Sequence, residues 1–300
     1  MTATTVIAGS WGKGGLDLAA IDGRTAEVQA RHHCPTGLAE ARGRHADVLT
    51  EGCGAWLARY PDAPVLLSGM VGGRGNWVET DYVPCPFEIA DLVSRAERVE
   101  AAGHSVTIVP GGSVRRQGID CDVMRGEEVQ VLGALAVAGI DSAAFCIPGT
   151  NAKWARAERG RMTGFATYVT GDLYDHLRNR SLVGALAEGE GFDAAAFTAG
   201  LDRVAGLGLS NAAFTARAAV LLERLKPEDV GAYLSGVVIG AEITDAARFR
   251  DQDRVLLIAG GGAAERYGLA LRHRGIAHEV IDASAARLAG LAALARAIPG

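Results

Sequence analysis

The sequence predicts an α/β protein built from two halves of similar plan. Short apolar segments with the length of buried strands alternate with longer segments whose apolar residues have helical spacing, a pattern typical of layered α/β folds. Each half opens with a strand, a glycine-rich turn and a second strand, and then continues as alternating strands and helices. The chain has 300 residues, of which 49% are hydrophobic and 22% charged, so it can form two medium-sized domains with real cores.

The N-terminal half is expected to begin with a hairpin. The segments TTVIAGS and LDLAAID flank the glycine-rich stretch 9–15, and Asp22-Gly23 is a turn dipeptide that leads to a third extended segment, RTAEVQARHH. The elements expected next are a helix over HADVLTEGCGAWLARY, a buried strand over APVLLSGM, a helix over EIADLVSRAERVEAAG, a strand over SVTIVPG and a helix that starts near Gly126.

The C-terminal half repeats this plan, and we expect the boundary near residues 139–143, which gives domains 1–140 and 141–300. The strand SAAFCIPGT runs into a second glycine-containing turn, which a hairpin over AKWARAERGRMTGFATYVTG follows. From Leu173 to about Gly240 the spacing is mostly helical, with a break at KPED. The chain then ends with a strand, a glycine turn and a helix over RVLLIAGGGAAERYGLALRHRG, the strand AHEVID and the helix ASAARLAGLAALARAI.

Charge and cysteine usage exclude several classes of protein. A net charge of −5 and a pI of about 5.8 do not favour nucleic acid or an anionic membrane as a partner. The five cysteines are scattered and form no C-x-x-C pair, which argues against a zinc site or a disulfide framework and favours a reducing cytoplasm. Neither a signal peptide nor a membrane-spanning run is expected. The sequence therefore predicts a cytoplasmic protein, with a homodimer as the default assembly.

Three glycine turns follow apolar strands, at Gly9–Gly15, Pro148–Lys153 and Gly260–Gly262. Glycine lets backbone amides approach a phosphate closely, and successive amides can form an anion-binding nest. Taken alone, each turn is more often a simple hairpin or the entry of a helix. None fits G-x-x-x-x-G-K-[ST], so this is not a P-loop protein, and GGGAAERYG does not match the Rossmann pattern G-x-G-x-x-G.

The segment Gly69–Pro86, GMVGGRGNWVETDYVPCP, is rich in polar and aromatic side chains for a loop that follows a strand. Ligands of open α/β sheets bind beyond the carboxyl ends of the strands, so Arg74, Trp77 and Glu79 are candidates for a ligand site. An arginine in such a loop can clamp a carboxylate with two parallel hydrogen bonds. The alternative, equally consistent with these residues, is a solvated loop anchored by Trp77 and Tyr82.

The segment DCDVMRGEEVQVLGAL is expected to place Asp122, Arg125, Glu127 and Glu128 at a helix entrance. Acids in a first helical turn are also ordinary caps. The functional interpretation is a carboxylate that accepts the proton of a substrate hydroxyl, as phosphoryl transfer to an alcohol requires, with Arg125 binding an anionic substrate. Lys153, in CIPGTNAKW, is placed to meet a transferring phosphoryl group, although a lone lysine is more often a solvated surface charge.

Five blocks, in this order, resemble the 2-dehydro-3-deoxygalactonokinases: SGMVGGRGNWVETDYVPCP, DVMRGEEVQVLGAL, CIPGTNAKW, FATYVTGDLYDHL and LLIAGGGAAERYGLAL. These are sugar-acid kinases of the actin-like ATPase superfamily, and the resemblance covers nearly the whole chain. It implies two RNase H-like domains with a cleft between them, across which ATP binds with Mg²⁺. It also implies phosphorylation of the 6-hydroxyl of 2-dehydro-3-deoxy-D-galactonate, or of a close sugar acid, in galactonate catabolism.

The resemblance gives expected roles to individual residues. Nucleotide-binding residues are expected in the first phosphate loop, in the second phosphate loop and beside the adenosine: Ser10, Trp11, Gly12, Lys13 and Gly14; Gly149, Thr150 and Asn151; and Gly260, Gly261 and Gly262. The candidates for the sugar-acid pocket are Arg74, Trp77, Glu79, Arg125 and Glu128. Glu127 is the expected general base because it lies at a helix start just before the second phosphate loop, with Asp122 as runner-up and Lys153 as a further catalytic residue. No residue is assigned to the metal ion.

The first phosphate loop departs from the family pattern D-W-G-T-T-N-x-R. Ser10 stands where the family has the carboxylate that the superfamily uses toward the metal ion, and Asp17 replaces the arginine. Lys13 and Gly14 replace the two threonines. A serine hydroxyl does not supply the formal charge of a carboxylate toward hydrated Mg²⁺.

The second loop also departs from its pattern, P-G-T-H-S-K-W, since Asn151 and Ala152 replace the histidine and the serine. Two hypotheses follow. One is a working kinase in which Lys13 and the glycine amides take over part of the phosphate neutralisation. The other is a weakly active or inactive relative that binds a sugar acid as a sensor or regulatory module. A third possibility is a kinase-fold protein with a different phosphoryl donor or acceptor.

Overall fold

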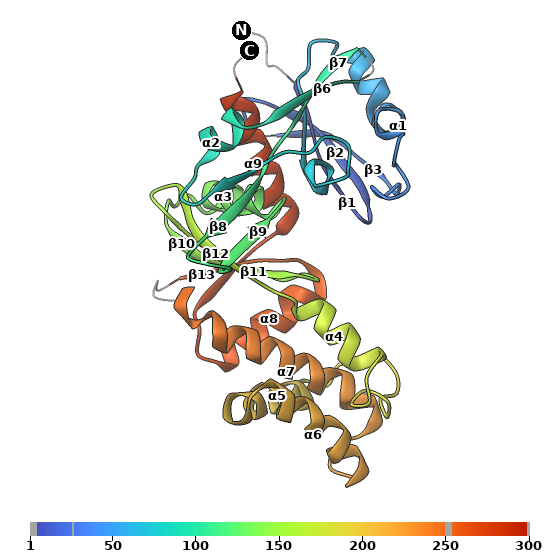
Figure 1. Ribbon diagram of the computed structural model, residues 1–300, viewed down its shortest axis with the longest axis vertical. Helices are drawn as coiled ribbons and strands as arrows, with labels where there is room; N and C mark the ends of the chain where they lie inside the picture. The colour runs from blue at the N-terminus through green and yellow to red at the C-terminus, as the bar shows by residue number, and fades with distance from the viewer. Residues whose placement is uncertain (1–4, 26, 102, 250–253, 299–300) are drawn as a thin grey trace. The chain divides into compact units, whose positions relative to one another are not determined.

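The computed structural model describes residues 5–25, 27–101, 103–249 and 254–298 (Figure 1). The chain divides into two compact units. Unit 1 contains the chain up to Ala143, the segment Arg156–Phe165 and the segment from Ile281 onward, and unit 2 contains Ala144–Ala155 and Ala166–Val280. The helix after Ile281 therefore belongs to unit 1, the same unit as the N-terminal strands.

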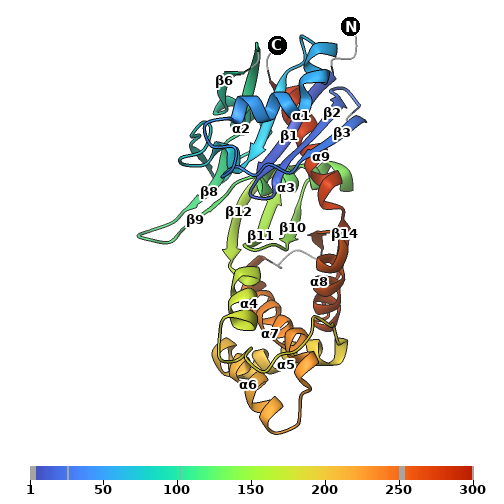
Figure 2. The same cartoon turned by 90° about the vertical axis from the view of Figure 1, so that its right-hand side faces the viewer.

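Unit 1 is built on a six-stranded sheet with the order β3-β2-β1-β4-β7-β6. Its strands are β1 (Thr5–Gly12), β2 (Gly15–Asp22), β3 (Val28–Cys34), β4 (Val65–Gly69), β6 (Glu97–Ala101) and β7 (His104–Ile108). Figure 2 shows β1, β2 and β3 side by side. The predicted hairpin is confirmed: Gly12 pairs with Gly15, which leaves a two-residue turn. Gly15 has a φ of 136°, and a Cβ atom there would lie 2.4 Å from the carbonyl oxygen of Cys34.

Helices cover both faces of this sheet. The helix α1 (His45–Arg59) shares a buried cluster with Ile7 and Leu18, whereas α9 (Ala283–Ala297) packs against β1 and β2. The helix α3 (Glu127–Ala138) lies along α9 (Figure 1). The two helices meet at glycines, since a Cβ atom on Gly133 would lie 1.9 Å from the carbonyl oxygen of Ala286. All three helices were expected from their apolar spacing, and the structure confirms them.

The segment 89–101 corrects one expectation, because only its first part is helical. The helix α2 covers Ile89–Ser94, and the following residues form β6, which pairs antiparallel with β7. The glycine between the two strands, Gly103, has a φ of 77° and closes their hairpin. Cross-strand pairing, which helical spacing does not reveal, decides the structure of β6.

Unit 1 also contains a three-stranded sheet, which was not expected from the sequence. It contains β5 (Tyr82–Pro84), β8 (Gly111–Arg115) and β9 (Cys121–Met124), in the order β5-β8-β9. Figure 2 shows the β8–β9 hairpin extending away from the large sheet. Asp122 lies in β9, so it does not take part in the helix entrance where the sequence placed it.

Unit 2 carries most of a five-stranded sheet and five helices. The strand order is β12-β11-β10-β13-β14, with β10 (Ala143–Ile147), β11 (Ala152–Glu158), β12 (Arg161–Tyr168), β13 (Val255–Ile258) and β14 (His278–Ile281). The helices are α4 (Thr170–Asn179), α5 (Ala194–Leu207), α6 (Leu209–Leu221), α7 (Val230–Asp245) and α8 (Gly261–His273). The predicted hairpin after β10, the helical stretch and its break at 226–229 are confirmed.

The helix α7 is the most apolar element of unit 2. With its flanking single turns it spans Pro227–Phe249, and in the described part of the chain it is the one helix long and apolar enough to cross a membrane. However, 72% of its apolar window is buried within the protein, where α7 packs against α4, α5 and α6 (Figure 1). Its composition is therefore accounted for by its place in the core.

Candidate active site

The first glycine loop is the tip of the β1–β2 hairpin, and the segment after β3 supports its backbone. The amide of Leu38 donates to the carbonyl oxygen of Gly12 at 3.2 Å. A Cβ atom on Gly37 would lie 2.1 Å from the carbonyl oxygen of Lys13, so the two backbones are in direct contact. Lys13 and Gly14 are exposed at the tip. The loop is thus supported on one side and open to solvent on the other.

Trp11 lies beneath this loop in an aromatic cluster. Its indole N–H donates to the carbonyl oxygen of Thr36 at 3.0 Å, and its ring meets those of His45 and Trp77 edge-on, at 5.5 and 6.2 Å. The rings of His45 and Trp77 are stacked 5.7 Å apart. Burial, together with the charge of Arg42, lowers the pKa of His45. Trp11 is wholly buried, so its side chain packs under the loop, and its role in nucleotide binding stays a prediction.

The ends of β1 and β4 and the start of α3 meet at Gly69. This glycine has a φ of 87°, and a Cβ atom on it would lie 3.1 Å from the Oγ of Ser10. A Cβ atom on Gly126, the residue before α3, would lie 3.2 Å from the Cα of Gly69. Ser10 and the first turn of α3, which begins with Glu127, are therefore neighbours across a single glycine.

The two adjacent glutamates of α3 lie in different surroundings. Glu127 is partly exposed, and its Oε2 accepts a hydrogen bond of 3.1 Å from the backbone amide of Arg125. Glu128 is wholly buried, and both of its oxygens lie 2.8 Å from the amide of Gly126. Burial, and then the charge of Glu127, raise the pKa of Glu128 to about 8. Glu128 therefore holds the helix start with its side chain buried, and its role in substrate binding stays a prediction.

Arg125 fastens the loop that follows η1 (Met70–Gly72). Its guanidinium donates to the hydroxyl and to the carbonyl oxygen of Thr80, at 2.5 and 3.0 Å, and lies over the ring of Tyr82 at 4.4 Å. A Cβ atom on Gly72 would lie 2.9 Å from one guanidinium nitrogen. These contacts engage both terminal nitrogens of Arg125, so its role as an anion ligand stays a prediction.

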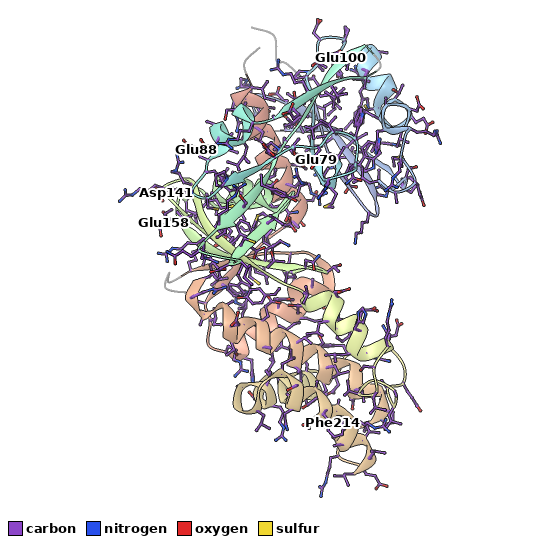
Figure 3. All side chains as sticks on the ribbon, viewed as in Figure 1. Glu79, Glu88, Glu100, Asp141, Glu158 and Phe214 are labelled. Atoms are coloured by element: carbon purple, nitrogen blue, oxygen red, sulfur yellow. The ribbon has the colours of Figure 1, made fainter. Side chains whose placement is uncertain are left out.

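The other sugar-acid candidates lie on or beside this loop. Arg74 and Glu79 are exposed, and Trp77 is half-buried (Figure 3 labels Glu79). The side-chain amide of Asn76 donates to the carbonyl oxygen of Met70 at 2.8 Å, which closes the loop on itself. Arg74 and Glu79 are thus side chains with surface to offer a polar ligand, and their assignment stays a prediction.

The second glycine loop connects β10 and β11 in unit 2. The carbonyl oxygen of Thr150 accepts hydrogen bonds of 3.1 Å from the amides of Gly171 and Asp172, so the start of α4 lies against the loop. A Cβ atom on Gly171 would lie 2.7 Å from the carbonyl oxygen of Gly149. Lys153 is buried, and its ammonium donates to the carbonyl oxygen of Asn151 at 2.9 Å, so it is not a solvated surface charge.

A cavity of about 190 Å³ adjoins this loop within unit 2. The loop lines it with Pro148 and Gly149, and the helix that follows Gly260–Gly262 lines it with Ala263 and Arg266. The structure thus brings the second glycine turn and the start of α8 to one cavity. An apolar cavity with a few polar groups at one end is a common form of ligand site.

Glu242 connects the elements around this cavity, and sequence reasoning missed it. Its buried carboxylate accepts hydrogen bonds from the indole of Trp154, the hydroxyl of Thr170 and the hydroxyl of Tyr267, at 2.8, 2.5 and 2.7 Å. Burial raises the pKa of Glu242, although these three hydrogen bonds oppose the rise. An acid enclosed by the apolar helical run VVIGAEI was the signal that could have indicated this network.

Carboxylates that could hold a metal ion do not gather in the structure. Within residues 5–25, 27–101, 103–249 and 254–298, no three or more histidine, cysteine, aspartate or glutamate side chains form such a group. Beside the first glycine loop, the candidate oxygens are the hydroxyl of Ser10 and the carboxylate of Asp17, which pairs with Arg287 and His33. This donor set does not form a preformed cage for a divalent cation.

The 2-keto-3-deoxy-galactonokinase family matches residues 10–294 of the chain. The chain belongs to this family. A probable 2-dehydro-3-deoxygalactonokinase of Rhizobium meliloti strain 1021 is 35% identical over 303 residues, which cover 99% of this chain and 98% of the relative. The 2-dehydro-3-deoxygalactonokinase of Escherichia coli strain K12 is 36% identical, over 84% of this chain and 85% of its own.

Solved structures agree with membership of the galactonokinase family. A protein from Sinorhizobium meliloti proposed to be a 2-dehydro-3-deoxygalactonokinase is 34% identical and superposes with a TM-score of 0.85, over 98% of this chain and 96% of its own. The activator of the 2-hydroxyisocaproyl-CoA dehydratase from Clostridium difficile shares the fold, with a TM-score of 0.52 at 16% identity, over 97% and 93% of the two chains. The predicted fold class, α/β with RNase H-like domains of the actin-like ATPase type, is confirmed, as is a carbohydrate kinase family.

Proposed function

We propose that the protein transfers the terminal phosphoryl group of ATP to the 6-hydroxyl of 2-dehydro-3-deoxy-D-galactonate, as a cytoplasmic enzyme of galactonate catabolism. The observation that carries this proposal is the position of Glu127, a partly exposed carboxylate that adjoins the first glycine loop across Gly69. Two relatives that are 35% and 36% identical carry this activity in their names and support it. They give no support to the alternative of an inactive sugar-acid sensor.

Glu127 acts as the general base in this proposal. It accepts the proton of the 6-hydroxyl while the hydroxyl oxygen forms its bond to the γ-phosphorus, and the bond to the leaving ADP oxygen breaks. The amide of Arg125 orients the carboxylate through its hydrogen bond to Oε2. Asp122 is the weaker candidate because its carboxylate accepts the amide of Val123 on β9, a strand separate from the loop at Gly69.

The loop between η1 and β5 binds the sugar acid. The exposed guanidinium of Arg74 can take the substrate carboxylate with two parallel hydrogen bonds, and Glu79 can accept from sugar hydroxyls. Arg125 positions this loop through Thr80, so it acts on the substrate indirectly. Trp77, stacked on His45, gives the loop a rigid apolar side.

The nucleotide binds to unit 2 at the cavity beside the second glycine loop. Gly149, Thr150 and Asn151 are exposed and offer backbone amides to the phosphates, and Lys153 stiffens their turn through Asn151. The adenosine lies against the start of α8, where Ala263 and Arg266 line the cavity. In unit 1, the exposed ammonium of Lys13 adds positive charge for the transferred phosphoryl group.

Mg²⁺ that enters with ATP would supply positive charge to the phosphate oxygens. Because the residues near Ser10 form no carboxylate cage, side chains of this chain would contribute little to holding the ion. Lys13 then carries part of the neutralisation. On this proposal, an enzyme with Ser10 in place of the family's carboxylate is still active, because Lys13 supplies positive charge near the phosphates.

The test is a coupled kinase assay on purified protein with ATP and 2-dehydro-3-deoxy-D-galactonate, with ³¹P NMR of the product. We expect a 6-phosphate and a strong preference for ATP. Glu127→Gln should lower kcat about a hundredfold or more with little change in KM. Glu100→Gln, at an exposed glutamate of the same unit (Figure 3), is the matched control and should leave both unchanged.

Three results would overturn parts of the proposal. Sugar-acid binding without nucleotide binding or turnover would support the alternative of an inactive sugar-acid sensor. Turnover with another phosphoryl donor, or with the gluco epimer of the acid alone, would change the substrates and keep the kinase. Full activity in Glu127→Gln would remove Glu127 from the role of base and favour Asp122.

A further inference from the structure

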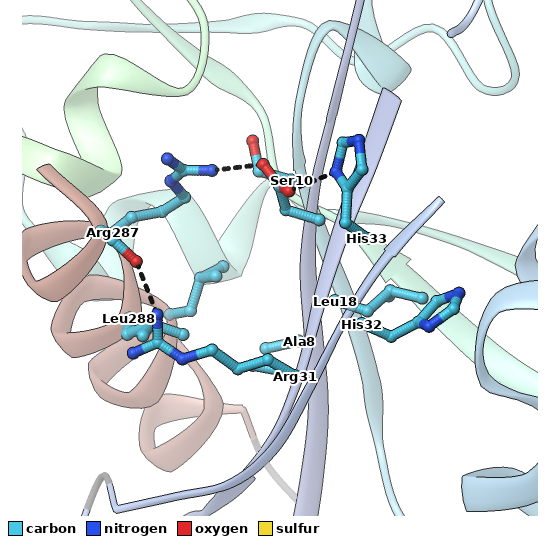
Figure 4. Close-up of a pocket in the computed structure, with 12 residues that line it drawn as sticks. Ala8, Ser10, Leu18, Arg31, His32, His33, Arg287 and Leu288 are labelled. Atoms are coloured by element: carbon cyan, nitrogen blue, oxygen red, sulfur yellow. Dashed lines mark hydrogen bonds and ion pairs between the residues drawn. The ribbon is translucent and has the colours of Figure 1, made fainter. Parts of the chain in front are cut away.

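A second cavity lies within unit 1, between the N-terminal sheet and α9, and has a volume of about 280 Å³ (Figure 4). Its floor is a face of the sheet, because residues paired across neighbouring antiparallel strands point to the same side. Ser10 on β1 pairs with Asp17 on β2, which pairs with His33 on β3. Arg31 belongs to the adjoining row on the same face.

The cavity contains more positive than negative charge. Arg287 from α9 donates to Asp17 at 3.0 Å, and the Nδ1 of His33 lies 2.8 Å from the other oxygen of Asp17 (Figure 4). Arg31 donates to the hydroxyl of Ser284 at 3.1 Å. Although burial raises the pKa of Asp17, its hydrogen bonds to His33 and Arg287 lower it further, so this carboxylate is ionised at neutral pH. Two guanidinium groups therefore face one carboxylate, an excess of one positive charge.

One nitrogen of Arg287 lacks a hydrogen-bond partner among the described residues. The Nε–H of this arginine is buried and donates to no protein partner among residues 5–25, 27–101, 103–249 and 254–298. Buried donors of this kind are nearly always paired in folded proteins, with protein, water or a bound ion. The unmet donor belongs to a residue that lines the cavity, so a ligand in the cavity is one way to satisfy it.

The tip of the first glycine loop does not line this cavity. Ser10 contributes to it, but Gly12, Lys13 and Gly14 are not among the residues that enclose it. It lies against α9, on the face of the sheet opposite to Trp11 and Leu16, which lie in the core with α1. An occupant would therefore contact α9 and the sheet without using the amides of the loop.

We infer that this cavity binds a small oxyanion, carboxylate or phosphate, at a site distinct from that of the nucleotide. Arg31 and Arg287 are suited to it because a guanidinium fork matches the paired oxygens of either group. The hydroxyls of Ser10 and Ser284 add neutral donors. The volume admits an ion of the size of phosphate or of a short organic acid.

The test is isothermal titration calorimetry of the full chain at neutral pH, with inorganic phosphate in one arm and citrate in the other. We expect one of them to bind at one site per chain, with a Kd that saturating non-hydrolysable ATP analogue leaves unchanged. Arg31→Gln should weaken this binding about tenfold, because it removes one charged donor from an exposed strand position. Arg24→Gln, at an exposed arginine of the same unit outside the cavity, should leave the Kd unchanged.

Asp17→Asn gives a test of opposite sign, since removing the only carboxylate among the cavity's charged residues should tighten anion binding severalfold. Thermal unfolding of each variant checks that it is folded. Binding of neither anion, loss of binding in the presence of the ATP analogue, or an unchanged Kd in Arg31→Gln would each overturn the inference. None of these results bears on the proposed kinase reaction, which the Glu127 variants test separately.

Discussion

The carboxylate of Glu242 and the indole of Trp154 share a hydrogen bond of 2.8 Å between residues 88 positions apart in the chain. Through the same carboxylate, α4 and α8 are tied to α7 and β11, and the three helices line the cavity beside the second glycine loop. The network is buried, so its donors have no water to replace a lost partner.

Glu242→Gln should therefore destabilise the protein by about 1–3 kcal/mol, because one carboxamide oxygen cannot serve three donors. We also expect weaker binding of an ATP analogue, since the cavity walls lose their common anchor. Thermal unfolding and calorimetric titration measure the two effects. Glu265→Gln, at an exposed glutamate of α8, is the control, and equal behaviour of the two variants would contradict the assignment.

Glu128 predicts a pH dependence of stability. Burial raises its pKa from 4.5 to about 8, so between these values the folded state holds a proton that the unfolded state has released. Its contribution is complete at a pH below about 4.5 and is lost as the pH rises toward about 8. Relative to Glu128→Gln, which cannot ionise, the wild type should lose about 5 kcal/mol of unfolding free energy across this range. Urea unfolding at several pH values tests this, and parallel curves for the two proteins would refute it.

Arg125→Lys should raise the KM for the sugar acid more than it lowers kcat. A lysine keeps the charge but loses the planar fork that binds Thr80 twice and covers Tyr82, so the loop that carries Arg74 and Glu79 becomes less ordered. A severalfold or larger rise in KM in steady-state assays is the expected result. Arg115→Lys, at an exposed position of β8, supplies the comparison. A change confined to kcat would point instead to a role in the chemical step.

Gly171→Ala should weaken nucleotide binding selectively. Its Cβ atom would lie 2.7 Å from the carbonyl oxygen of Gly149 and 2.8 Å from the Cα of Thr150, so the second glycine loop must move. Sugar-acid binding, which we assign to unit 1, should persist in calorimetric titrations while the affinity for an ATP analogue falls at least about tenfold. Gly206→Ala in α5 has open space around the new atom and should leave both affinities unchanged. Equal loss of both ligands would contradict the division of roles.

Much of the fold was predictable because its signals are local. The hairpin at 12–15, the helices α1 and α3, and the strand–turn–helix unit of β13 and α8 follow from apolar spacing and glycine placement within short windows. The strands β6, β8 and β9 were missed, because short strands with several exposed residues are set by pairing with distant neighbours.

The candidate site was predicted at the level of its segments. Composition and resemblance indicated the loops at Lys13 and Thr150 and the acid at Glu127, whose roles stay predictions. The contacts of the other residues were not predictable, since the partners of Arg125 and Trp154 lie 45 and 88 positions away. The burial of Trp11 and Glu128 likewise depends on which elements cover them.

The glycine contact between α3 and α9 has a consequence for how the protein is made. The sheet of unit 1 leaves the ribosome before unit 2, but the helix that packs against α3 through Gly133 and Gly290 is synthesised only after unit 2. At roughly 5–20 residues per second, the nascent sheet and α3 wait on the order of ten seconds with that face uncovered. Unit 1 therefore completes its folding only after unit 2 has been made, and any chain that stops before Ile281 leaves it without its closing helix.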